Sequence, residues 1–212
     1  MAEYEKEKYW SKLANTFDED QRYIVGGAVQ QQAIVERLSG ERDLGELIEL
    51  GCGAGFYTKF LVANASHVVA TDLSDEMLAV AITQLKDLQN VTVAKADCEK
   101  TDFPDGKFGS VFMANLVHVI ENPSTTLKEA YRILKDGGLL LIVDYTGYGM
   151  KWFEKMKMGM RALRKFGRPP SSSRNLSPDE LCSLVESAGF KVEEVQLIGD
   201  RSKAVYLRGR KG

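Results

Sequence analysis

Three glycines, Gly51, Gly53 and Gly55, stand at alternate positions in the stretch IELGCGAGFYT. Glycine tolerates positive φ and lets the backbone approach a ligand closely. Such a loop predicts a ligand that lies against bare main chain. An acidic residue, Asp72, follows about 20 residues later, where a carboxylate in nucleotide-binding sheets accepts hydrogen bonds from ribose hydroxyls. Together these residues predict a cofactor that contains a nucleoside.

The loop spacing separates the classes of nucleoside cofactor. Dinucleotide-binding loops have the pattern GxGxxG, whose third glycine lets the helix approach the pyrophosphate. Here that position is Phe56, and the GK[ST] of a triphosphate-binding loop is absent. A ligand with a ribose but no phosphates fits better, and S-adenosyl-L-methionine is the obvious candidate. A nicotinamide-dependent oxidoreductase stays open as an alternative enzyme.

Length and composition limit the classes of function. The chain has 212 residues, which predicts one domain. Its formal net charge of −2 argues against a dedicated nucleic-acid binder. Three separated cysteines and two histidines predict reduced thiols, a cytoplasmic location and no metal site. The N-terminus is too charged for a signal peptide, and no apolar run approaches the ~20 residues that cross a bilayer.

Short apolar strands alternate with helices through the middle of the chain, which predicts a doubly wound, mostly parallel α/β sheet. The predicted strands are 47–50, 68–71, 91–94, 110–114, 139–143, 191–197 and 204–207. The predicted helices are 25–38, 56–65, 74–88, 122–135 and 177–189. In such a sheet, ligands bind at the carboxyl ends of the strands, and the glycine loop leaves the first strand at that edge.

With these elements in order, the sequence resembles the class I S-adenosylmethionine-dependent methyltransferases. The segments similar to the motifs of that family are 49–55, 71–78, 96–98, 115–119 and 127–138. The closing pattern resembles the small-molecule branch near the ubiquinone/menaquinone C-methyltransferases. The resemblance implies a Rossmann-like methyltransferase fold with a seven-stranded sheet whose last strand is antiparallel. It also implies a single domain over 1–212, with an N-terminal helical cap over about 1–40 and a lid insertion over about 146–176.

The resemblance implies a role for four residues at the methionine end of the cofactor. The backbone of Gly51 and Gly53 would line the methionine moiety, and Glu49 would order the loop beneath its amino group. The carbonyl or side chain of Asn115 would meet the ammonium. A purely structural cap stays open for Glu49.

A second group of residues is implied at the adenosine end. Asp72 would bind the ribose hydroxyls, while Leu73 and Met77 would enclose the adenine. Asp97 would accept from the adenine amino group, and the backbone N–H of Cys98 would donate to a ring nitrogen. The alternatives are a strand-end cap for Asp72, a loop cap for Asp97 and plain helix core for Met77.

The implied reaction is an in-line displacement at a sulfonium methyl group, for which the protein mainly supplies approach, alignment and desolvation. A base is needed only if the acceptor must lose a proton early. His118 is the first candidate and Tyr145 the second, with structural roles open for both. The predicted acceptor is a small molecule, an apolar one being an option. A non-catalytic cofactor-binding partner protein is an alternative, and RNA or protein methylation is less favoured.

Two segments outside the predicted sheet could cover the pocket. The first carries the aromatic residues Tyr9, Trp10, Phe17 and Tyr23, of which Tyr9 or Phe17 could touch the cofactor. The second, 148–175, has apolar residues at three- and four-residue steps, which predict one apolar helix face: Met150, Phe153, Met156, Met160, Leu163 and Phe166. This helix is interpreted as a lid, as a cap on the core, or as a basic amphipathic helix in transient contact with a membrane surface. Residues 169–173 are interpreted as a mobile hinge, and the chain as a monomer or homodimer.

Overall fold

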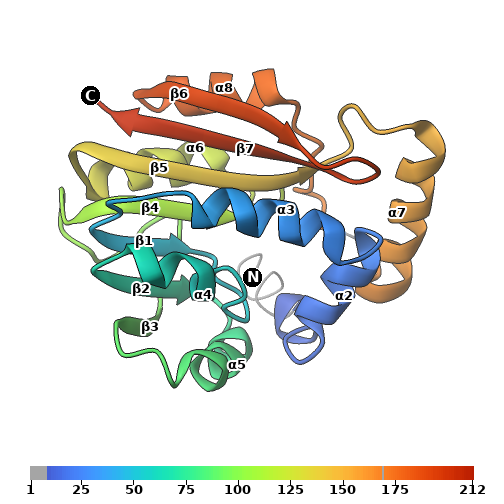
Figure 1. Ribbon diagram of the computed structural model, residues 1–212, viewed down its shortest axis with the longest axis horizontal. Helices are drawn as coiled ribbons and strands as arrows, with labels where there is room; N and C mark the ends of the chain where they lie inside the picture. Colours follow the sequence, from blue (N-terminus) through green and yellow to red (C-terminus); the bar gives the residue numbers. More distant parts are fainter. Residues whose placement is uncertain (1–8, 169) are drawn as a thin grey trace.

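The computed structural model describes residues 9–168 and 170–212, whose centre is a seven-stranded sheet (Figure 1). Its strands are β1 (Glu46–Leu50), β2 (His67–Asp72), β3 (Val91–Lys95), β4 (Phe108–Ala114), β5 (Leu134–Thr146), β6 (Phe190–Ile198) and β7 (Lys203–Lys211). They lie in the order β3-β2-β1-β4-β5-β7-β6. Strands β1 to β5 pair in parallel, and β7 is antiparallel to both of its neighbours. The predicted mostly parallel sheet with an antiparallel last strand is confirmed.

Helices cover both faces of this sheet because the strands are apolar on both sides. The helices are α2 (Phe17–Ile24), α3 (Ala28–Ser39), α4 (Thr58–Leu61), α5 (Asp75–Leu85), α6 (Pro123–Ile133), α7 (Trp152–Phe166) and α8 (Pro178–Ser187), with a 3-10 turn η1 (Val62–Asn64). One core joins α6 and α8 to the sheet, and a second core joins α3 and α4 to the other face. None of the helices within the described ranges combines the length and apolar character needed to span a bilayer.

Two helices begin at side-chain caps, at the residues where the predicted ranges 74–88 and 177–189 begin. The Ser74 hydroxyl accepts a hydrogen bond from the Met77 N–H at 3.2 Å and starts α5. Ser177 and Glu180 form a capping box at the start of α8. Each arrangement satisfies backbone donors that have no partner within the helix. Asn122 precedes α6 without a side-chain cap, and its amide donates to Glu99 instead.

The predicted helix 25–38 is wrong at its start, and its buried face does not follow its apolar residues. Gly26 and Gly27 have φ of +87° and +127°, so the helix begins only at Ala28. Val29 is 81% exposed, and the buried side chains are instead Gln30, Gln31, Ile34 and Leu38. Gln30 is held there because its amide donates to the Ile198 carbonyl.

Three other predicted boundaries also shift. The helix α6 ends at Ile133, and Leu134 already pairs with Phe108, so the glycines at 137 and 138 lie within β5 rather than ending the helix. The predicted helix 56–65 consists of the short α4 and η1. Helix α5 ends at Leu85, three residues before the predicted end.

Candidate functional site

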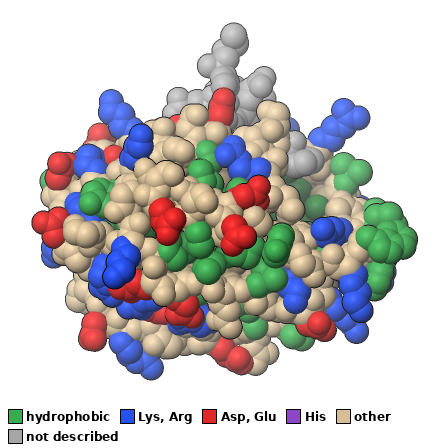
Figure 2. Space-filling view, turned by 90° about the horizontal axis from the view of Figure 1, so that it is seen from above, with side chains coloured by type: hydrophobic (Ala, Val, Ile, Leu, Met, Phe, Trp, Pro, Cys, Tyr) green, Lys and Arg blue, Asp and Glu red, His purple; other side chains and the backbone are tan. Residues whose placement is uncertain are grey.

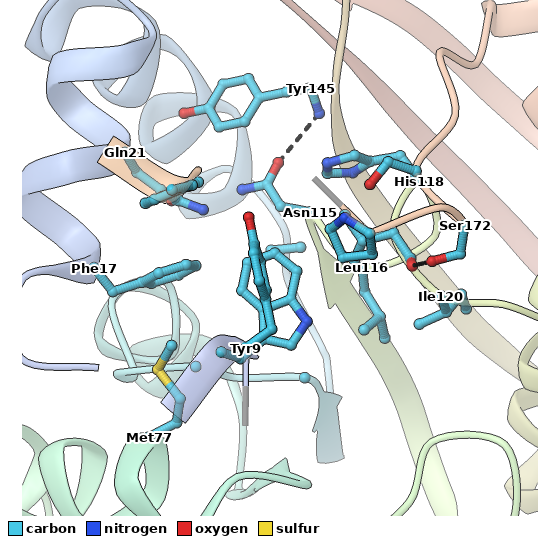
Figure 3. A pocket seen from close by; sticks show the side chains of 18 of the residues that line it. Tyr9, Phe17, Gln21, Met77, Asn115, Leu116, His118, Ile120, Tyr145 and Ser172 are labelled. Atoms are coloured by element: carbon cyan, nitrogen blue, oxygen red, sulfur yellow. Dashed lines mark hydrogen bonds between the residues drawn. The ribbon is translucent and has the colours of Figure 1, made fainter. Parts of the chain in front are cut away.

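A cavity of about 730 Å³ lies at the carboxyl ends of the parallel strands, between the sheet and the helices α2 and α7 (Figure 3). That volume is typical of a ligand pocket (~300–1,000 Å³). Residues from the loops after β1, β2, β3, β4 and β5 line it. They include all of the predicted cofactor-binding residues: Glu49, Gly51, Gly53, Asp72, Leu73, Met77, Asp97, Cys98 and Asn115. Both candidate bases, His118 and Tyr145, also line it.

The glycine loop forms one wall of this cavity with its main chain. Gly53 has φ of +53°, and a Cβ there would lie 3.3 Å from the Phe17 ring. Gly55 has a different purpose, because a Cβ there would lie 2.9 Å from the Leu85 side chain of α5. The first part of the loop therefore faces the cavity, whereas the last glycine permits close helix packing.

The Asp72 carboxylate joins two loops at the edge of the cavity. Its Oδ2 accepts from the Gly53 N–H and its Oδ1 accepts from the Ser74 N–H, both at 2.9 Å. Burial raises the pKa of the Asp72 carboxyl, and these backbone donors lower it in part. Each carboxylate oxygen has a second lone pair, so Asp72 can hold the loop and still accept from a ligand.

Glu49 is a buried acid directly beneath the loop. It is 1% exposed, and its Oε2 accepts from the Thr58 hydroxyl at 2.5 Å. Burial raises the pKa of the Glu49 carboxyl to about 8, and the nearby Asp72 acts in the same direction. The carboxyl is therefore mostly protonated at neutral pH, and a cation placed beside it would favour the carboxylate.

The loop after β3 lines the cavity together with Leu73 and Met77. Asp97 Oδ1 accepts from the Glu99 N–H at 2.8 Å, so this side chain caps its own loop as well as lining the cavity. Burial raises the pKa of the Cys98 thiol to about 12. That thiol is packed rather than reactive, because the thiolate is the nucleophilic form.

Asn115 occupies a left-handed backbone conformation at the end of β4, with φ of +54°. Its Oδ1 accepts from the Tyr145 N–H at 3.1 Å (Figure 3), and its own N–H donates to the Val143 carbonyl at 2.8 Å. The side-chain oxygen thus joins β4 to β5.

Two tyrosine hydroxyls in the cavity wall have no hydrogen-bond partner of acceptable geometry among the described residues. They belong to Tyr57 and Tyr145, and both are buried. Burial raises the pKa of Tyr57 to about 12 and that of Tyr145 as well, and each hydroxyl is close enough to affect the other. Buried polar groups are normally satisfied. Tyr57 and Tyr145 interact with each other, and Tyr57 also interacts with Asn115, so the two hydroxyls present polar atoms at this end of the cavity.

The His118 imidazole is oriented by a buried carboxylate that the sequence analysis missed. Its Nδ1 lies 2.5 Å from Asp144 Oδ1, and its backbone N–H donates to Asp144 Oδ2 at 3.0 Å. Asp144 is 1% exposed near the end of β5. With Nδ1 donating to this carboxylate, Nε2 of the neutral ring is an acceptor. The sequence signal was a single acid that interrupts the apolar run LLLIVDY.

Helices α2 and α7 cover the cavity together. The rings of Phe17 and Phe166 stack with centroids 5.8 Å apart, and Lys165 Nζ pairs with Asp20 at 2.7 Å. Tyr9, Trp10 and Phe17 line the cavity, as expected for the N-terminal segment, whereas Tyr23 is 43% exposed. Residues 1–8 of the predicted cap lie outside the described residues.

The predicted apolar face of the second covering segment turns only partly toward the cavity, which its members Leu163 and Phe166 line. Met158, Ala162 and Phe166, one helical turn apart, line the cavity. Met156 and Met160 are more than half exposed on the side that faces solvent. The helix is apolar on both sides, so its periodicity does not tell which side faces the protein.

Ser172, which belongs to the hinge interpreted above, and the neighbouring Arg174 are hydrogen-bonded to the loop after β4. The Ser172 hydroxyl donates to the Val119 carbonyl at 2.5 Å. The Arg174 N–H donates to the His118 carbonyl at 2.9 Å, and its guanidinium donates to the Ile120 carbonyl at 3.0 Å. These bonds connect the end of the lid segment to the backbone of His118. Pro169 lies outside the described residues.

Comparison with known proteins gives a consistent result. A family model described as a methyltransferase domain matches residues 48–142. The ubiquinone/menaquinone biosynthesis C-methyltransferase UbiE of Vibrio cholerae is 28% identical over 173 residues, which are 72% of this chain and 66% of that protein. The chain spans less than two thirds of the length of the curated relatives it matches.

Two solved structures are also similar. A SAM dependent methyltransferase from Aquifex aeolicus is 25% identical, with a TM-score of 0.66 over 84% of this chain and 88% of that chain. A SAM-dependent methyltransferase from Thermotoga maritima, similar in fold, has a TM-score of 0.74 at 20% identity and covers 97% of this chain and 99% of that chain. The family model, the relatives and the sheet order agree with the resemblance seen in the sequence. Residues 48–142 therefore match a methyltransferase domain, and the chain is similar to S-adenosylmethionine-dependent methyltransferases.

Proposed function

We propose that this chain transfers a methyl group from S-adenosylmethionine to a small molecule by in-line displacement. The observation that carries the proposal is the convergence of all the predicted cofactor-binding residues on one cavity. The bare glycine backbone and the buried acids fit a polar nucleoside ligand. When bound, this cofactor supplies a methyl group that its sulfonium charge already activates.

The methionine end belongs at the glycine loop. The main chain of Gly51 and Gly53 forms the contact surface, and the Asn115 carbonyl accepts from the ammonium. Glu49 lies beneath the loop, where the ammonium favours its carboxylate. Since Glu49 also bonds Thr58, it orders the loop at the same time.

The adenosine end belongs between the loops after β2 and β3. Asp72 accepts from the ribose hydroxyls while it holds the Gly53 N–H. Leu73 and Met77 enclose the adenine, Asp97 accepts from its amino group, and the Cys98 N–H donates to a ring nitrogen. Phe56 lines the same cavity where a dinucleotide-binding loop needs glycine, which disfavours a pyrophosphate.

The acceptor belongs beneath the covering helices. The cavity wall there is mostly aromatic and aliphatic, with Trp10, Phe17, Ala162 and Phe166 among its residues. This lining favours a small acceptor with an apolar body, and the name of the Vibrio cholerae relative is consistent with that class. His118 Nε2 takes the proton that the acceptor loses, with Asp144 as its positioning residue.

Titration calorimetry tests the cofactor assignment. We expect S-adenosylmethionine and its demethylated product to bind, and NADH not to bind. The Asp72→Asn variant should weaken binding by about 1–3 kcal/mol, because hydrogen bonds to a charged group are lost. Asp87→Asn, at an exposed position on the same chain, is the matched control. Failure of both ligands to bind the wild-type protein would reject the proposal.

A labelled-methyl assay on small-molecule extracts tests the transfer itself. We expect label to enter a small organic molecule and to depend on His118. Label that enters only RNA or protein would instead support the less favoured alternatives. Cofactor binding without any transfer would support a non-catalytic binding protein.

A further inference from the structure

The helix α7 carries an apolar stripe on the side that faces solvent. Trp152 is 71% exposed, Met156 54% and Met160 59%, at steps of four residues. We name these three residues the outer stripe. No side chain of α7 is buried. We propose that the outer stripe docks α7 onto the surface of an anionic lipid bilayer.

Another side of α7 is already in contact with the protein. Met158, Ala162 and Phe166 line the cavity, and Lys165 pairs with Asp20 of α2. A helix at a protein surface normally turns its polar side to solvent. Here the outward side is apolar, so packing within the described chain does not explain the outer stripe.

The charges around the outer stripe identify the kind of surface it fits. Residues 151–168 contain seven Lys or Arg and one Glu, in a chain whose net charge is −2. At 100° per residue, Lys155 flanks the outer stripe on one side, and Lys157 and Arg164 flank it on the other. Figure 2 shows hydrophobic side chains gathered at the end of the molecule that α7 forms, with Lys and Arg beside them. Apolar side chains between basic ones match an acyl boundary beneath anionic head groups.

A bilayer fits this face better than a second copy of the chain. A two-fold dimer through the outer stripe would place the basic side chains of one copy near those of the other. Anionic head groups would neutralise the same charges. An exposed tryptophan also suits a bilayer interface, where its ring spans apolar and polar layers.

The docked position has a consequence for the acceptor. The outer stripe and the cavity-lining side chains belong to the same helix, so a molecule dissolved in the bilayer would be next to the cover of the pocket. This consequence rests on the proposed function, whereas the docking itself does not. A bilayer-bound α7 would place the cavity at the membrane surface and make apolar acceptors accessible without transfer through water.

Vesicle cosedimentation tests the docking. We compare phosphatidylcholine vesicles that contain phosphatidylglycerol with vesicles of phosphatidylcholine alone, and we expect binding to the anionic vesicles only. The triple variant Trp152→Ser, Met156→Ser, Met160→Ser should lower the partition coefficient at least about tenfold. The control Val29→Ser, Ile82→Ser removes exposed apolar side chains from α3 and α5 and should bind like the wild type.

A charge variant and a spectroscopic signal complete the test. Lys157→Glu, Arg164→Glu should lose anionic binding, whereas the exposed pair Lys86→Glu, Lys191→Glu should lose much less. Trp152 is one of two tryptophans, so in a Trp10→Phe background its fluorescence should shift to the blue on anionic vesicles.

The docking is overturned if the wild type ignores anionic vesicles, or if the triple variant binds them equally well. It is also overturned if sedimentation velocity without lipid shows that the wild type is a dimer and the triple variant a monomer. Calorimetry with S-adenosylmethionine on the same proteins separates the two proposals. A triple variant that binds the cofactor but not vesicles supports the docking, and a wild type that binds vesicles but not the cofactor rejects only the proposed function.

Discussion

Glu49 is an acid held without solvent exposure at the floor of the cavity, and it makes the stability of the empty protein depend on pH. Its pKa rises from an ordinary 4.5 to about 8 on folding. Between these values the folded chain keeps a proton that the unfolded chain loses, so this residue lowers stability as pH rises from 5 to 8. Below 4.5 both states are protonated and the effect is absent.

Glu49→Gln should therefore become increasingly more stable than the wild type as pH rises from 5 to 8. The amide keeps an oxygen that accepts from Thr58 but has no proton to lose. Thermal unfolding of both proteins without ligand, at several pH values, measures the difference. Parallel curves over this range would show that the buried acid is not protonated at neutral pH.

A second residue-scale feature is the contact between His118 and Asp144. In Asp144→Asn an amide N–H would replace the accepting oxygen, so the ring would change tautomer and Nε2 would carry the proton. If Nε2 acts as a base, kcat should fall by about 10²–10⁴ while the affinity for S-adenosylmethionine stays the same. His118→Ala should behave alike.

Kinetics and calorimetry on the same samples decide this point. The Thr92→Ala variant is a control, since it alters the contact of the other histidine, His67, on the exposed surface. If kcat is unchanged in Asp144→Asn, His118 has a packing role, the alternative left open by the sequence.

At the scale of elements, the loop after β1 has a conformation that its glycines permit. Gly53→Ala adds a Cβ at φ of +53° and 3.3 Å from Phe17, and its N–H is the donor that Asp72 fixes. We expect the variant to fold and to bind S-adenosylmethionine at least about tenfold more weakly. Left-handed backbone costs an alanine about 1–2 kcal/mol, and the loop would relieve this strain by leaving the shape that lines the cavity.

Gly137→Ala separates strain from the effect on the site. Gly137 also has positive φ, +71°, but lies in β5 with nothing within 4 Å of an added Cβ. The Gly137→Ala variant should be less stable than the wild type and should bind S-adenosylmethionine with the wild-type affinity. Equal affinities of the two variants in calorimetry would show that the loop around Gly53 does not contact the ligand.

The same scale shows what could be predicted from the sequence. The strands were found because burial on both faces leaves continuous apolar runs, and Ser74 and Ser177 marked two helix starts correctly. The α3 face was missed because Gln30 is buried through a bond to Ile198, a contact far away in the sequence. Asp144 was missed for a similar reason, since its partner His118 becomes a neighbour only when β4 and β5 pair.

At the scale of the whole molecule, the site combines a rigid floor and a separate cover. The floor consists of loops that leave paired strands with buried cores on both faces. The cover consists of α2 and α7, which meet through the Phe17–Phe166 stack and the Lys165–Asp20 pair. Since no side chain of α7 is buried, little apolar contact opposes its local opening.

A ligand that fills the cavity should therefore stabilise the cover more than the sheet. We expect S-adenosylmethionine to slow amide hydrogen exchange most in α2, α7 and the loop around Gly53, because these segments contact the filled cavity on one side only. Global stabilisation by mass action, about 2.7 kcal/mol at a hundredfold excess over Kd, should slow exchange of the strands only where they exchange by complete unfolding. NADH is the control ligand, and it should change exchange neither in the covering helices nor in the strands. Equal protection from exchange in α7 and in β6 would mean that the covering helices form one cooperative unit with the sheet. The acceptor would then have to enter the cavity by a route other than the opening of α7.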